Sequence, residues 1–133
     1  MNNMFDITTY GALGDGKTDC TAAVQEALDD AGTCGGTVIV PPGIYLTGKL
    51  HMRAGTALNG YAAWSFRNDG TSVFVLKDSE SDCLLDITDA FGCSVTGMCL
   101  NGRELGENIH GIMLRRDKYN GGGEEDTPTV DNC

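Results

Sequence analysis

The sequence predicts a mainly β protein that winds into a solenoid, with a single helix closing its N-terminal end. Three observations support this fold class. Only residues 19–31 carry a convincing helical pattern. From Thr37 onward the chain is a series of short β-rich runs separated by Gly, Asn, Asp and Pro. Within that series, residues 84–99 and 112–133 share a weak internal echo, which is typical of stacked coils.

The expected helix follows a short extended opening at residues 5–10 and a glycine-rich stretch at residues 11–21, GALGDGKTDCT. Thr18 or Asp19 is expected to cap the N-terminus of the helix, and Gly32 is expected to end it. Small or apolar side chains show the spacing of one buried helix face. They occupy positions 20, 23, 24, 27, 28 and 31.

The β-rich runs fill the rest of the chain. No helical pattern lies between them, so the crossover helices of an ordinary parallel sheet are missing. The alternatives are an antiparallel sandwich or barrel and a coiled solenoid. The runs are TVIV (37–40), IYLTG (44–48), KLHM (49–52), TALNG (56–60), SVFVLKD (72–78), CLLDITD (83–89), SVTGMCLNG (94–102), HGIMLRR (110–116) and PTVDN (128–132).

The internal echo favours the solenoid. In residues 84–99 and again in residues 112–133, an apolar strand with a charge at its end gives way to a loop and then to a short V-x-x-[MC] strand. Solenoids tolerate insertions because each coil contacts only its neighbours. The second copy carries such an insertion, DKYNGGGEED, and we interpret its charge run as solvated surface. That run consists of Glu124, Glu125 and Asp126.

The stretch GALGDGKTDCT has three alternative interpretations. Its glycines fall at 11, 14 and 16, which fails the G-x-x-x-x-G-K-[ST] spacing of a phosphate-binding loop. The Asp ladder and closing Glu of an EF-hand loop are also missing, although another calcium geometry with Asp15 and Asp19 as ligands stays open. We expect a structural turn, in which Gly14 and Gly16 allow positive φ and Asp15 binds the local backbone.

Composition narrows the classes of partner. The net charge of −10, from 19 acidic and 9 basic residues without a basic stripe, argues against nucleic acid and anionic membranes as partners. No signal-peptide pattern and no membrane-spanning run occur, so the chain as written is expected in the cytoplasm.

The cysteines and histidines argue against a zinc site. Six cysteines occur without a CxxC pair, and His51 and His110 are far apart in the sequence. A disulfide framework is one interpretation of the cysteines, but without a signal peptide it lacks its usual compartment. We expect four of them to be buried free thiols, because they lie among apolar periodic positions. These are Cys20, Cys83, Cys93 and Cys99.

Residues 5–60 closely resemble the opening segment of a known family. FDITTYGALGDGKTDCTAAVQEALDDAG, followed by GGTVIVPPGIYLTGKL, is similar in order, spacing and residue type to the start of the pectate lyase superfamily, the polygalacturonase-like right-handed parallel β-helices. One departure is Cys20, where that family usually has a second Asp. The resemblance implies a right-handed parallel β-helix whose N-terminal mouth is covered by the helix.

The resemblance also implies where catalytic residues would be sought. Polygalacturonases carry N-T-D, D-D, G-H-G and R-I-K motifs, and this sequence has none of them in the required order. The pair Asp29 and Asp30 is better interpreted as solvated helix surface. In lyases an Arg can act as base or neutralise a uronate carboxylate, so the remaining catalytic candidates are His110, Arg115, Arg116 and Asp117. An aromatic group could stack on a sugar or pack over the first coils, namely Tyr61, Trp64 and Phe66.

We divide the chain into an N-terminal segment with the capping helix (1–36) and the first β-helix coils (37–133). The leading hypothesis is the N-terminal part of a carbohydrate-active enzyme, a glycoside hydrolase or lyase acting on a pectin-like polysaccharide. Its catalytic residues would lie downstream, since PTVDNC stops within a coil pattern and suggests a longer protein.

The alternative is a non-catalytic β-helix, such as a phage tailspike-like fibre or an adhesin, because a shared fold does not decide function. No cofactor is expected apart from the open calcium question, and no oligomeric state follows from the sequence. The family resemblance leaves an extracellular location open beside the cytoplasmic one.

Overall fold

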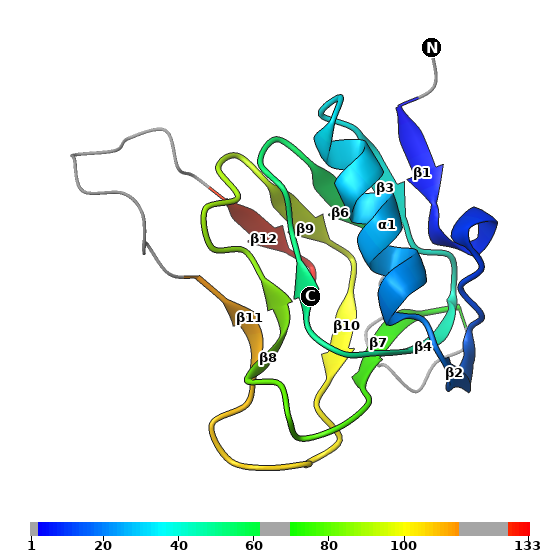
Figure 1. The fold of residues 1–133 in the computed structure, drawn as a ribbon, viewed down its shortest axis with the longest axis vertical. Coiled ribbons are helices and arrows are strands. Elements are labelled where there is room, and N and C mark those ends of the chain that lie inside the picture. Colours follow the sequence, from blue (N-terminus) through cyan, green and yellow to red (C-terminus); the bar gives the residue numbers. More distant parts are fainter. Residues whose placement is uncertain (1–2, 62–69, 115–127) are drawn as a thin grey trace.

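The computed structural model describes residues 3–61, 70–114 and 128–133. They form a right-handed parallel β-helix with one α-helix packed at one end of the stack (Figure 1). The expected fold class is therefore confirmed. Among these residues no helix is long and apolar enough to cross a membrane.

The strands are short, as the runs punctuated by Gly, Asn and Pro predict. The 3₁₀ helix η1 spans Ile7–Tyr10 and the α-helix α1 spans Thr21–Gly32. The strands are β1 (Met4–Asp6), β2 (Asp15–Asp19), β3 (Thr37–Ile39), β4 (Gly43–Thr47), β5 (Leu50–His51), β6 (Ala57–Asn59), β7 (Ser72–Leu76), β8 (Cys83–Asp86), β9 (Ser94–Thr96), β10 (Cys99–Asn101), β11 (His110–Met113) and β12 (Thr129–Asp131).

Three parallel sheets form the faces of the solenoid. Their strand orders are β1-β3-β6-β9-β12, β10-β7-β4-β2 and β11-β8-β5. Strands that follow one another along the chain mostly belong to different sheets, so each circuit of the chain adds one strand to each face. All strand pairs in the described part of the chain are parallel, which excludes the antiparallel sandwich or barrel.

The core consists of ladders of apolar side chains that point inward at matching positions of successive coils. In the first sheet Val38, Leu58 and Val95 are register partners and are fully buried. In the second sheet Tyr45 and Phe74 pair in register, and their rings meet edge to face with centroids 6.4 Å apart. Because each coil extends the same ladders, burial of apolar surface stabilises the stack coil by coil.

The internal echo seen in the sequence is a pair of stacked coils. Strand β11 pairs with β8, and β12 pairs with β9. The two valines of the V-x-x-[MC] strands, Val95 and Val130, are direct register partners. The repeat therefore reflects two coils that place equivalent residues one above the other.

Helix α1 covers the end of the stack at which β1, β3 and β5 lie (Figure 1). Its buried face consists of Val24, Ala27, Leu28 and Ala31, all fully buried in the core. This stripe has the spacing that the sequence predicts, and it shields the apolar interior from water. The capping role of the helix is confirmed.

Two local expectations at the N-terminal end are wrong. Residues 7–10 form a 3₁₀ helix instead of extended chain, because Asp6 accepts a hydrogen bond from the backbone of Thr8. Residues 15–19 form strand β2, because they pair with β4. The helix ends at Gly32, as expected, and is followed by a right-handed C-cap at Thr33.

The glycine stretch and the helix start are only partly as expected. Gly16 has a positive φ of 71°, but Gly14 does not, and a side chain on Gly14 would meet the backbone of Gly43 at 3.1 Å. Close approach of two chain segments is therefore the reason for Gly14. Cys20 occupies the N-cap position, while Asp19 accepts a hydrogen bond from the Thr21 backbone and so still serves the first turn.

The cysteines are all free. Cys20, Cys83 and Cys93 are buried and Cys99 is half-buried, whereas Cys34 and Cys133 are exposed. Burial raises the pKa of all four buried or half-buried thiols, that of Cys83 to about 11. They pack as small apolar side chains, as the sequence predicts, and are unreactive at neutral pH.

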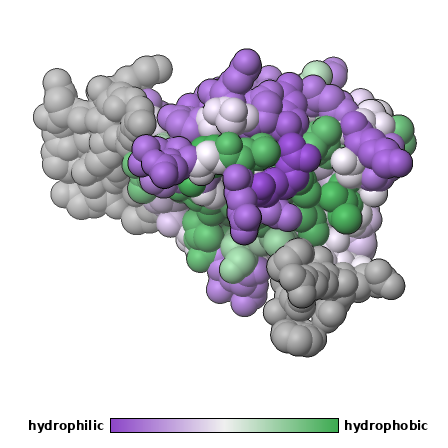
Figure 2. Space-filling view, turned by 90° about the horizontal axis from the view of Figure 1, so that it is seen from below, coloured by the Kyte–Doolittle hydropathy of each residue, from purple (hydrophilic) through white to green (hydrophobic). Residues whose placement is uncertain are grey.

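In the part of the chain that the structure describes, the large exposed apolar side chains do not gather on one element. Figure 2 shows a face on which hydrophobic surface alternates with hydrophilic surface. The large exposed apolar residues are Met4, Leu13, Ile44, Tyr61, Phe91, Leu114 and Val130, which come from widely separated elements and loops. Single exposed apolar residues of this kind are normal on a protein surface.

Candidate functional site

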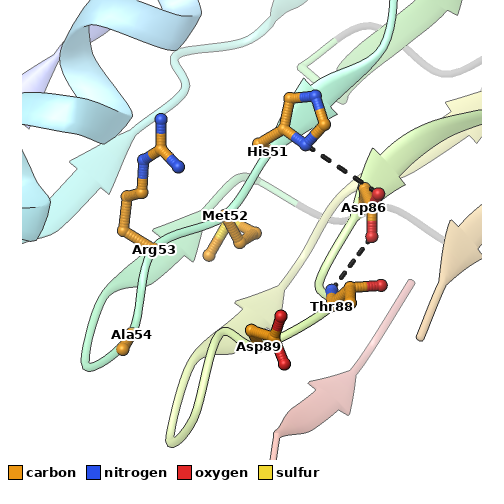
Figure 3. A pocket seen from close by; sticks show the side chains of 7 residues that line it. All are labelled: His51, Met52, Arg53, Ala54, Asp86, Thr88 and Asp89. Atoms are coloured by element: carbon orange, nitrogen blue, oxygen red, sulfur yellow. Dashed lines mark hydrogen bonds and ion pairs between the residues drawn. The ribbon is translucent and has the colours of Figure 1, made fainter. Parts of the chain in front are cut away.

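A polar hollow of about 340 Å³ lies where the turn after β5 stacks on the turn after β8. Two backbone hydrogen bonds hold the turns together, from Met52 N to Asp86 O at 3.0 Å and from Gly55 N to Phe91 O at 2.9 Å. The hollow is lined by His51, Met52, Arg53, Ala54, Asp86, Thr88 and Asp89 (Figure 3). Its two halves are distant in sequence and meet only because the coils stack.

Helix α1 positions one wall of the hollow. The side-chain amide of Gln25 accepts a hydrogen bond from His51 N at 2.8 Å and donates one to His51 O at 2.9 Å. One turn further along the helix, Asp29 Oδ1 binds Arg53 through both Nε and Nη2, each at 2.7 Å. The helix therefore holds the backbone of His51 and the guanidinium of Arg53.

A charge network supports the opposite wall. The ammonium of Lys49 lies 2.9 Å from Asp82 and 3.6 Å from Asp86. Burial would raise the pKa of Asp86, but hydrogen bonds from Thr88 and the nearby Lys49 and His51 outweigh it and lower that pKa. The hydrogen bond from Lys49 likewise lowers the pKa of Asp82. Both carboxyls therefore stay ionised at neutral pH.

Two residues that line the hollow, His51 and Asp89, have side-chain atoms without a close hydrogen-bond partner among the described residues. Asp89 has a left-handed backbone with φ of 60°, and its buried Oδ1 has no hydrogen-bond partner among the described residues. His51 Nδ1 lies 3.8 Å from Asp86 Oδ2, too far for a hydrogen bond. A bound molecule with hydrogen-bond donors could satisfy Asp89 without displacing an existing interaction.

The residues predicted for catalysis do not meet in this hollow. His110 begins β11, is exposed, and stands in register with Cys83. It does not line the hollow. Arg115, Arg116 and Asp117 lie outside the described residues, so their role stays a prediction.

The other groups singled out in the sequence are also only partly described. Trp64 and Phe66 lie outside the described residues, and so does the charge run at 124–126. Tyr61 is described and exposed. Whether these aromatic residues stack on a sugar therefore stays a prediction.

The carboxylates proposed for calcium are engaged by the protein itself. Asp15 Oδ1 accepts hydrogen bonds from the backbones of Lys17 and Thr18, and its Oδ2 accepts one from the Thr18 hydroxyl. These bonds lower the pKa of Asp15 to about 2. Asp15 therefore binds the local backbone as expected, within strand β2 and not in a free turn.

Asp19 is engaged in the same way. Its Oδ1 accepts hydrogen bonds from Thr21, and its Oδ2 binds the ammonium of Lys77 at 2.9 Å. The hydrogen bonds from Thr21 and Lys77 lower the pKa of Asp19 to about 2. The described residues contain no cluster of three or more His, Cys, Asp or Glu that could hold a metal ion. Calcium binding through Asp15 and Asp19 stays a prediction.

Sequence reasoning missed the residues that build the hollow. Asp29 and Asp30 are exposed, as expected, but the sequence did not show that Asp29 binds Arg53 or that Asp30 accepts a 2.6 Å hydrogen bond from the Tyr10 hydroxyl. The available signal was the spacing of Thr21, Gln25 and Asp29, polar residues four apart on one side of the buried helix stripe. Such a row is suited to binding the backbone of a neighbouring segment.

The fold and the stacked coils define this chain as a parallel β-helix protein. Comparison with known families agrees with this class. The family described as rhamnogalacturonase A/epimerase, pectate lyase-like, matches residues 4–83. This chain belongs to that family.

Curated relatives share parts of the chain. Residues of this chain are 53% identical over 52 positions to an exopolygalacturonase from Zea mays, which covers 36% of this chain and 12% of the relative. The mannuronan C5-epimerase AlgE3 from Azotobacter vinelandii is 32% identical over 95 residues, covering 71% of this chain and 5% of the relative. The chain thus spans a small part of these relatives' length.

A solved structure supports the fold. The A-module of the mannuronan C-5 epimerase AlgE6 from Azotobacter vinelandii matches with a TM-score of 0.68 at 22% identity. The match covers 96% of this chain and 36% of that structure. At this identity the likeness concerns the fold and not the chemistry.

Proposed function

We propose that this chain forms the helix-capped coils of a polysaccharide-degrading β-helix enzyme, a glycoside hydrolase or lyase with a pectin-like substrate. The observation that carries the proposal is membership of the pectate lyase-like family over residues 4–83. Relatives that bear the names exopolygalacturonase and mannuronan C5-epimerase support a polymer of sugars as the ligand.

Within this function, the described coils would bind the polysaccharide and support the neighbouring coils. The catalytic groups would lie elsewhere in the protein. Hydrolysis of a glycosidic bond needs a carboxylic acid that is still protonated near neutral pH. Asp82 and Asp86 have the opposite property, since the pKa of each is lowered. They are suited to accepting hydrogen bonds from a ligand and to holding Lys49 in place.

The lowered pKa values of Asp82 and Asp86 also fit a second candidate, a non-catalytic β-helix that binds carbohydrate. In that case the ionised carboxylates and the cap would serve recognition and stability alone. The two candidates differ in whether any protein that contains these coils releases products.

The test compares this chain with a longer protein in which the same chain continues into further coils. Both are incubated with pectin, polygalacturonate, xylan and alginate. Reducing ends report hydrolysis, and the absorbance of unsaturated uronates reports β-elimination. We expect neither signal from the 133-residue chain and one of them from the longer protein. Product release by the short chain would contradict the placement of catalysis outside it, and a silent longer protein that still binds the polymer would favour the non-catalytic candidate.

A further inference from the structure

We infer that the hollow between the turns after β5 and β8 is a binding subsite for a neutral, hydroxyl-rich sugar residue. The inference deepens the proposed function, because it names the ligand class of one site on these coils. Three features support it: the size of the hollow, the unpartnered carboxylate oxygen of Asp89, and the local charge (Figure 3).

The size and lining of the hollow suit a small polar ligand. Its volume of about 340 Å³ lies at the lower end of the usual range for ligand pockets. Most of its lining is polar, with His51, Arg53, Asp86, Thr88 and Asp89 contributing charged or hydrogen-bonding side chains. Such a surface offers acceptors and donors to a sugar ring in several directions.

Asp89 supplies the acceptor that the ligand must satisfy. A buried carboxylate oxygen without a partner is destabilising, because it has given up water without gaining a hydrogen bond. Asp89 Oδ1 is in this state, and Asp89 is one of the residues that line the hollow. A sugar hydroxyl donates one hydrogen bond and fits this position.

The local charge disfavours an anionic ligand. Four carboxyl groups surround the hollow or bind its walls, those of Asp29, Asp82, Asp86 and Asp89. Among the residues that the structure describes, two permanent cations oppose them, Lys49 and Arg53, and both already bind carboxylates. The whole chain carries a net charge of −10 as well. A uronate carboxylate placed here would meet like charge, whereas a neutral hydroxymethyl group would not.

The described geometry also disfavours a metal ion. A hard cation such as calcium takes six to eight oxygen ligands. Asp86 already accepts from Thr88 N and lies beside Lys49. The described part of the chain holds no group of three or more acidic, His or Cys side chains suited to a metal.

The test uses two sugars that differ only at C6, methyl α-D-galactopyranoside and methyl α-D-galacturonopyranoside, with calcium chloride as a third probe. Binding to the 133-residue chain is followed through the backbone amide signals of residues 51–54 and 86–89 in ¹⁵N NMR. We expect the galactoside to shift these signals saturably and to bind about fivefold or more tightly than the galacturonide.

The variant Asp89→Gly keeps the left-handed backbone and removes the carboxylate. It should weaken galactoside binding by about tenfold or more. Its matched control is Asn108→Gly, because Asn108 also has φ of 60° but is exposed and does not line the hollow. The control should leave binding unchanged, and both variants should keep the spectrum of a folded protein.

Several outcomes would overturn the inference: tighter binding of the galacturonide, saturable calcium binding that Asp89→Gly abolishes, or no shift of these signals by either sugar. The proposed degrading function fails on a separate measurement, product release by the longer protein. A longer protein that is active but does not bind galactoside overturns the subsite alone, and galactoside binding without product release overturns the degrading activity alone.

Discussion

The two ends of the described stack of coils differ in what covers them. At one end α1 lies over the stack with four fully buried apolar side chains. At the other end β12 is exposed at all three of its residues, and Val130, the last member of its ladder, is 47% exposed (Figure 1). Among the described residues no further strand pairs with the outer edges of β10, β11 and β12.

The difference shows what a cap must supply. The end of a β-helix presents both an apolar core and a row of unpaired backbone groups. Helix α1 meets both needs, because its apolar stripe covers the core while Thr21 and Gln25 bind the backbone of Gly48 and His51. A helix without the polar row would cover the core and leave the edge of β5 unsatisfied.

The largest expected effect comes from breaking the apolar stripe. The substitution Leu28→Asp puts a charge against the core, and we expect it to lower the free energy of unfolding by about 4 kcal/mol or more. The protein should unfold or aggregate, and Val24→Asp should do the same. Thermal unfolding and size-exclusion chromatography measure this effect.

The control for this substitution is Val130→Asp in β12, at the end of the described stack opposite to α1. Val130 is almost half exposed, so the new carboxylate can stay hydrated and should cost less than about 1 kcal/mol. Equal losses at the two ends would contradict the contrast between them. An unchanged thermal midpoint for Leu28→Asp would contradict the capping role of α1.

Removal of a side chain from the polar row of α1, which consists of Thr21, Gln25 and Asp29, should lower stability less. Gln25→Ala leaves His51 N and His51 O without their side-chain partner, and we expect a loss of roughly 1 to 2 kcal/mol because water can reach the site in part. Glu26→Ala is the matched control, since Glu26 is exposed one position away on the same helix. The two variants are compared by urea denaturation, and hydrogen exchange of the His51 amide should accelerate only in Gln25→Ala.

Substitution of Asp15 tests whether the glycine-rich stretch at residues 11–21 has a structural role. Its folded pKa of about 2 lies below the ordinary value, so the carboxylate contributes stability above the ordinary pKa and loses it as pH falls toward 2. Asp15→Ala should therefore lower the thermal midpoint at pH 7 and flatten its decline in acid. Isothermal titration should find no calcium or nucleotide affinity that this variant removes; saturable binding lost in Asp15→Ala would favour a ligand site instead.

The smallest effect is expected for the contact between η1 and α1. The hydrogen bond to Asp30, helped by burial, raises the pKa of Tyr10 to about 12. The raised value means that the contribution of Tyr10 is complete below pH 10 and disappears as pH rises through 12. Tyr10→Phe should cost under about 1 kcal/mol at pH 8 and nothing at pH 12. A difference between the two proteins that grew with pH would contradict this assignment.

Much of the fold could be predicted because it depends on local patterns. Each predicted β-rich run contains at least one strand, since alternation and turn residues act within a few positions of the chain. The helix was predicted within two residues of its start and one of its end. The misassigned segments, residues 7–10 and 15–19, take their structure from a side-chain cap at Asp6 and from pairing with β4.

The sequence by itself determined the strand-forming runs and the side of α1 that is buried, because both follow from the residues along a short stretch. Only the tertiary structure decided which polar groups meet. His51 and Asp86 are register partners on adjacent coils, and Asp29 reaches Arg53 from the helix. These contacts depend on how many residues each circuit of the solenoid uses, and the long turns that set this number leave no periodic pattern in the chain.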